Sequence, residues 1–127
     1  MLIIENYDDL LALNRALMEV RYLASDVDAA TRGSSFLSDV HSRVVDEIVA
    51  NAETSGNAKE VERWRNWRQF RARSVERPLL LGYLRSVWRG DAEPDQKRRV
   101  VTNQLRPFMF TEDDLEQLIS VLDSPTE

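Results

Sequence analysis

The chain has 127 residues, a net charge of −5 and a pI near 5.0, so it is long enough for one hydrophobic core and too short for two ordinary domains. It contains no cysteine and a single histidine, His41, which excludes disulfide bridges, thiolate metal sites and a catalytic thiol. Hydrophobic residues make up 43% and charged residues 31%, a balance typical of a folded protein. We expect one domain that spans residues 1–127.

The N-terminal residues 1–9 carry no basic segment and turn acidic after a short apolar lead, unlike a secretory signal. No apolar run approaches the roughly 18 residues that are needed to cross a membrane. The sequence therefore predicts a cytoplasmic protein without a membrane segment.

A first helix is predicted over residues 7–25, because Asn6 can cap it and Asp8 and Asp9 lie in its first turn, where carboxylates favour the exposed N–H groups. Apolar residues at helical spacing give this helix two stripes, so it needs cover on two sides. A homodimer through the second stripe is a further hypothesis. The first stripe contains Leu10, Leu13, Leu17, Val20 and Ala24, and the second contains Leu11, Met18 and Tyr22.

A second helix is predicted over residues 36–52, with Ser34 or Ser35 as its cap. A third is predicted over residues 58–76. It should stop near Pro78, because proline disfavours a helical residue before it and cannot donate to the turn behind it.

Three more helices complete the predicted fold. The first covers residues 79–88, and the second covers residues 94–105, with Pro94 suited to its first position. The last begins after Thr111, which can cap it ahead of three carboxylates. The sequence thus predicts an all-α, single-domain bundle of five or six helices.

The most distinctive feature is the segment from Arg63 to Arg73, in which an aromatic residue and an arginine recur every three positions. Arginine and tryptophan dominate binding energy when a partner desolvates them, and guanidinium groups can stack on the indole rings. We predict a partner-binding surface made of Arg63, Trp64, Trp67, Arg68 and Arg71, with Arg85, Trp88 and Arg89 as a second patch.

The same segment also fits an ordinary amphipathic helix. In that interpretation Val61, Trp64, Trp67 and Val75 face the core, and the arginines lie along the border with their charged ends in water. Exposure of the indole rings separates the two interpretations.

Charge is segregated along the chain. Residues 1–58 carry a net −6, residues 59–106 a net +7 and residues 107–127 a net −6. A basic middle can pair with the acidic flanks of its own chain or face an anionic partner, and the sequence leaves both open.

Candidate catalytic groups are few. The acidic clusters at Asp8 and at residues 112–116 lie where helices begin, which attract carboxylates without any catalytic need, and His41 fits a structural role. We therefore expect no enzyme activity, no cofactor and no metal site. The predicted function is that of a small protein-binding regulator, adaptor or inhibitor; the alternative is a nucleic-acid-binding regulator that uses residues 63–99.

Overall fold

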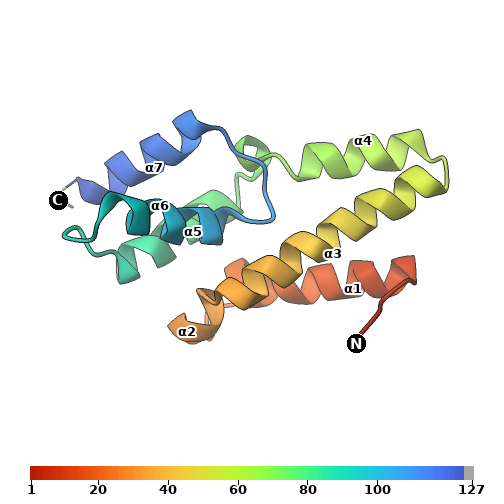
Figure 1. The fold of residues 1–127 in the computed structure, drawn as a ribbon, viewed down its shortest axis with the longest axis horizontal. Coiled ribbons are helices and arrows are strands. Elements are labelled where there is room, and N and C mark those ends of the chain that lie inside the picture. Colours follow the sequence, from red (N-terminus) through yellow and green to blue (C-terminus); the bar gives the residue numbers. More distant parts are fainter. Residues whose placement is uncertain (125–127) are drawn as a thin grey trace.

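The computed structural model describes residues 1–124 and is an all-α bundle with no strand in that range, as the sequence predicts (Figure 1). A π-helical turn, η1 (Glu19–Leu23), follows the first helix, and a 3-10 turn, η2 (Phe70–Ala72), follows the fourth. The α-helices are α1 (Tyr7–Met18), α2 (Ala29–Arg32), α3 (Ser35–Thr54), α4 (Ala58–Trp67), α5 (Glu76–Val87), α6 (Pro94–Leu105) and α7 (Glu112–Asp123).

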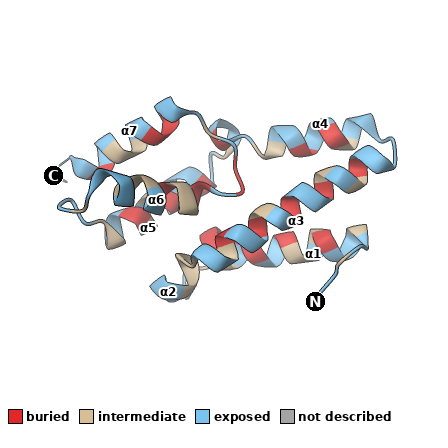
Figure 2. Cartoon of the chain, in the orientation of Figure 1, coloured by how far each residue is buried: buried red, intermediate tan, exposed pale blue. Residues whose placement is uncertain are grey.

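The bundle has two parts, which Figure 1 shows side by side. Helices α1, α3 and α4 pack around one cluster of buried apolar side chains, which includes Leu10, Ile48 and Trp64. Helices α5, α6 and α7, with Tyr22 from η1, enclose a second cluster. Trp67 packs against both clusters and so lies at their junction. Buried positions follow the inner faces of the helices in both parts (Figure 2).

Local sequence signals set the helix starts. The side chains of Asn6, Ser34 and Thr111 each accept a hydrogen bond from a backbone N–H in the first turn of the helix that follows, which confirms these three predicted caps. The carboxylate of Asp114 in turn accepts a hydrogen bond from the backbone N–H of Thr111, which completes a capping box. The fifth predicted helix has the bounds of α6, with Pro94 at its start.

The predicted third helix over residues 58–76 is wrong in its second half. It ends at Trp67, where residues 68–70 turn to bond with the backbone of Met109: Met109 N–H donates to Arg68 O at 2.8 Å and Phe70 N–H to Met109 O at 3.0 Å. Pro78 lies in the first turn of α5 instead of ending a helix. A proline is tolerated there because the N–H that it lacks would have no acceptor within the helix.

The second stripe of the first helix is not a dimer surface. Met18 and Tyr22 are 8% and 1% exposed, because the α5–α7 part of the same chain covers them. The hypothesis of a homodimer through these residues is therefore wrong. The predicted single helix over residues 7–25 also changes to a π-helical turn at Glu19, which brings Arg21 inside the fold.

No helix within residues 1–124 is both long enough and apolar enough to cross a membrane.

A donor-lined cavity between α1 and α4

The two tryptophans of α4 belong to the fold rather than to an open surface. Trp64 is 8% exposed, and its indole N–H donates to the hydroxyl of Tyr7 at 2.9 Å. Trp67 is half-buried and meets Trp64 edge to face, with ring centroids 5.2 Å apart. The core-facing interpretation is thus correct for Trp64, but Val75, assigned there to the same buried stripe, is 62% exposed.

The three arginines of the first predicted surface are paired with acids of the same chain. Arg63 pairs within α4, whereas Arg68 reaches α3 and Arg71 reaches α7, so the basic middle of the sequence pairs in part with its own acidic flanks. Arg68 is the most enclosed of them, and its Nε also donates to Pro107 O at 2.7 Å. The pairs are Arg63 with Glu60 at 3.0 Å, Arg68 with Asp46 at 2.7 Å and Arg71 with Asp114 at 3.0 Å.

Two guanidinium groups stack on the indole rings of α4. Arg63 lies over Trp64 and Arg73 over Trp67, with the guanidinium carbon 5.6 and 5.2 Å from the ring centroids. Arg73 takes this position because the chain leaves the helix at Trp67 and folds back through η2.

The predicted second patch lies in the other part of the bundle. Arg85 is exposed on α5, whereas Arg89 follows the end of that helix, so the two are not neighbours on one helix face. Trp88 is half-buried, and its indole N–H donates to Asp123 at 3.0 Å. The structure therefore does not join these residues to the α4 segment in one surface.

A buried polar network crosses the junction between the two parts. Arg21 and His41 are 1% and 0% exposed, and a terminal nitrogen of Arg21 lies 2.9 Å from His41 Nδ1. Because a guanidinium nitrogen can only donate, Nδ1 is the acceptor and the imidazole proton is on Nε2. That Nε2–H donates to Asn14 Oδ1 at 2.8 Å, which leaves the two N–H donors of the Asn14 amide for other partners.

Burial, together with the positive charges of Arg21 and Arg68, lowers the pKa of His41 to about 3. The imidazole is therefore neutral at physiological pH. Arg21 has no carboxylate partner among residues 1–124; its guanidinium donates to the carbonyls of Asn103, at 2.9 Å, and Arg106 at the end of α6. A cation is stabilised at this place because the C-terminal end of a helix carries partial negative charge.

The network ends at the wall of a cavity of about 410 Å³ between α1 and α4. We call it the α1–α4 cavity. Its lining combines apolar and aromatic side chains with an amide, three arginines and one glutamate, and two of the arginines stack on the two indole rings. Its lining residues are Leu11, Asn14, Arg15, Met18, Leu23, Arg63, Trp64, Trp67, Arg73 and Glu76.

Several hydrogen-bond donors of this lining are unused by the chain. The amide nitrogen of Asn14 makes no hydrogen bond to a described residue. Among the described residues, the fully enclosed side-chain nitrogens without a partner are Arg21 Nε and Arg73 Nε, and Asn14 and Arg73 both line the cavity. The guanidinium of Arg73 is 3.9 Å from the Glu76 carboxylate, beyond hydrogen-bond distance. Arg15 is exposed and forms no ion pair with any residue up to Ser124.

One exposed apolar side chain belongs to the lining, and two more are close in sequence to the lining residue Glu76. Leu23, in its lining, is 40% exposed. Val75 and Leu79, on either side of Glu76 in the sequence, are 62% and 41% exposed. The element that carries Leu23 contacts α5, which carries Leu79. We call Leu23, Val75 and Leu79 the apolar rim.

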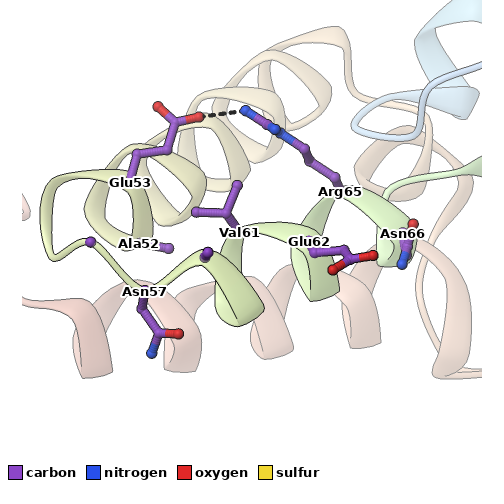
Figure 3. A pocket seen from close by; sticks show the side chains of 9 residues that line it. Ala52, Glu53, Asn57, Val61, Glu62, Arg65 and Asn66 are labelled. Carbon is purple, nitrogen blue, oxygen red and sulfur yellow. Dashed lines mark hydrogen bonds and ion pairs between the residues drawn. The ribbon is translucent and has the colours of Figure 1, made fainter.

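A larger hollow of about 680 Å³ at the turn between α3 and α4 offers less chemistry. Figure 3 shows that Arg65 reaches across it to Glu53, and the two side chains are 2.8 Å apart. The arginine of this hollow is thus already paired with Glu53, and its one other charged side chain, Glu62, is acidic. For this reason the α1–α4 cavity is the better candidate site.

Three residues of the lining, Arg63, Trp64 and Trp67, are among those that the sequence predicts to bind a partner. The sequence does not predict the polar and charged residues that lie with them in the lining, which are Asn14, Arg15, Arg73 and Glu76. No single helix carries these residues. Asn14 lies between the two apolar stripes of the first helix, four residues after Leu10 and three before Leu17, and this spacing is the sequence signal that could have shown it to be buried. Within residues 1–124 no group of three histidine or carboxylate side chains could hold a metal ion.

The sequence matches no protein-family model, and the searches of curated proteins and of solved structures found no similar chain.

Proposed function

We propose that this chain is a non-catalytic protein-binding module, a small regulator, adaptor or inhibitor, and that it binds its partner at the α1–α4 cavity and the apolar rim. The observation that supports the proposal is the combination of unused donors on Asn14, Arg15 and Arg73 with exposed apolar side chains beside them. Protein interfaces combine such an aromatic and arginine-containing pocket with apolar contacts around it.

Binding of nucleic acid through residues 63–99 is the weaker alternative. Arg63, Arg68 and Arg71 each pair with a carboxylate of the chain, so a phosphate backbone would have to compete with an internal partner for each of them. Their charge is less available than the sequence alone indicates.

The test is capture of partners from native lysate of the source cells by the tagged protein, with and without nuclease. Two variants place a charge on the apolar rim, Val75→Asp and Leu79→Asp, and Val121→Asp places one on an exposed apolar position of α7 as a matched control. We expect a partner protein that survives nuclease, binds the control and is lost from both rim variants.

Circular dichroism should first establish that the three variants are folded. Material that disappears with nuclease would favour the nucleic-acid alternative. A partner that binds the rim variants as well as the wild type would contradict the proposed surface.

A further inference from the structure

The buried network sets the hydrogen-bond role of Asn14, one of the residues that line the α1–α4 cavity. Arg21 makes His41 Nδ1 an acceptor, His41 Nε2–H then makes Asn14 Oδ1 an acceptor, and the amide nitrogen of Asn14 is left as a donor. Asn14 is 6% exposed, so its orientation is held by the fold. Arg15 and Arg73 are in the same lining, and Glu76 is its one carboxylate, so donors outnumber acceptors among the charged side chains and the lining favours a group that accepts hydrogen bonds.

The charge of the lining limits what that group can be. Arg63 is neutralised by Glu60 at 3.0 Å, and Glu76, 3.9 Å from Arg73, adds one negative charge to the lining that also holds Arg15. The surplus is thus about one positive charge, which favours a singly charged anion over a doubly charged phosphate. A carboxylate is the common singly charged acceptor of proteins, and arginine binds it through two parallel hydrogen bonds.

The apolar residues of the lining and the rim indicate what kind of molecule carries the carboxylate. Trp67, Leu11, Met18 and Leu23 belong to the lining, and the exposed Val75 and Leu79 lie one and three positions from the lining residue Glu76 in the sequence. A free small acid would use only the inner walls. A peptide segment would also cover the rim, whose three side chains are 40 to 62% exposed.

We infer that the α1–α4 cavity receives an acidic side chain of the partner protein, on a segment whose neighbouring apolar side chains cover Leu23, Val75 and Leu79. The carboxylate accepts from Asn14, Arg15 and Arg73, and Trp67 excludes water from one side of it. The inference rests on the proposed function and specifies the chemistry of the partner.

The test needs no identified partner. The ¹⁵N-labelled full chain is titrated with the blocked peptide acetyl-Leu-Glu-Leu-Leu-amide and with the matched peptide acetyl-Leu-Gln-Leu-Leu-amide, which differs only in the charge of one side chain. We expect saturable shifts of the Trp67 indole N–H and the Asn14 amide with the glutamate peptide, and at least fivefold weaker binding of the glutamine peptide.

Variants assign the effect to the cavity. Arg15→Gln and Arg73→Gln should each weaken the glutamate peptide at least threefold, whereas Arg43→Gln, an exposed arginine of α3 outside the lining, should not change it. Because Arg15 is exposed, its variant should fold even if the Arg73 variant does not.

Equal binding of the two peptides, no saturable shift, or no effect of Arg15→Gln would each overturn the inference. Stronger binding of inorganic phosphate, or binding of free 4-methylpentanoate without the peptide, would also overturn it, because the source would then not be a protein segment. These outcomes are separate from the capture experiment. If a partner is captured and depends on the rim but the titration is negative, only the inference about the acidic side chain is contradicted. If the titration is positive but no partner is captured, the protein-binding function is contradicted.

Discussion

Arg21 and His41 form a buried pair in which the arginine donates to the imidazole, with 2.9 Å between the terminal guanidinium nitrogen and Nδ1. The arrangement is unusual because a buried arginine is more often paired with a carboxylate. Here the carbonyl oxygens at the end of α6 take the place of a carboxylate, and the imidazole must stay neutral to accept. The pair therefore links the protonation of His41 to the contact between the two parts of the bundle.

The first prediction is acid destabilisation. The folded-state pKa of His41 is lowered from 6.5 to about 3, so between these values the unfolded state binds the proton that the folded state excludes. Stability from this group is complete above pH 6.5 and is lost as the pH falls toward 3. We expect a loss of about 3 kcal/mol from His41 between pH 7 and pH 4. Urea unfolding at a series of pH values measures it.

Because the chain has one histidine, NMR can follow this imidazole alone. Its resonances should stay those of the neutral form with the proton on Nε2 for as long as the protein remains folded. Titration near pH 6.5 in the native protein would show that the ring is accessible and that the pair with Arg21 does not form.

The second prediction concerns the cation itself. Arg21→Met keeps an apolar stem of similar length but leaves the Nδ1 of His41 without a donor. It also removes one of two hydrogen bonds to each of the carbonyls of Asn103 and Arg106, which keep the hydroxyls of Ser38 and Tyr22 as donors. A buried acceptor without a partner costs about 1–3 kcal/mol and a lost hydrogen bond from a charged group about 1.5–3 kcal/mol, so we expect a total loss of about 3 kcal/mol or more in urea unfolding. Arg43→Met, at an exposed position, should change stability by no more than about 0.5 kcal/mol. Equal midpoints for the two variants would contradict the role of Arg21.

The helix caps were predictable from the sequence because their signals are local. Asn6, Ser34 and Thr111 each bond to an N–H three positions further along, a distance that the sequence itself specifies. The same holds for Pro94 at the start of α6. Such signals depend on nothing outside one helical turn.

The end of α4 and the position of Arg21 were not predictable, because both depend on distant residues. The helical pattern continues past Trp67, but the backbone of Met109 competes for Arg68 and Phe70 and ends the helix. Arg21 bonds to Asn103, which is 82 residues away. From the sequence alone, an arginine at position 21 is expected to face solvent. It is buried because the carbonyls at the end of α6 accept its hydrogen bonds. The candidate cavity was missed for the same reason, since its donors come from three separate segments.

The third prediction tests the capping box of α7. Asp114 is 8% exposed; burial opposes its ionisation, but the Thr111 backbone N–H and Arg71 outweigh that effect and lower its pKa. Asp114→Ala removes the bond to Thr111 and the partner of Arg71, and we expect a loss of about 1–2 kcal/mol at pH 7. Asp113→Ala, in the same turn but exposed, is the control and should cost less. Thermal unfolding of the two variants makes the comparison, and an equal effect would argue against the capping box.

The fourth prediction concerns the junction between the two apolar clusters. Trp67 packs against both clusters, whereas Trp88 packs against the second one alone. Trp67→Ala should therefore cost about 3 kcal/mol and should also reduce the cooperativity of unfolding, because the two parts lose a shared side chain. Trp88→Ala should lower stability without separating the parts.

Hydrogen exchange of amides in α3 and α6 measures this directly. We expect the two helices to have the same free energy of opening in the wild type and in the Trp88 variant, and two different free energies of opening in the Trp67 variant. A single shared free energy in all three proteins would show that the buried network around Arg21 is sufficient to hold the parts together without Trp67.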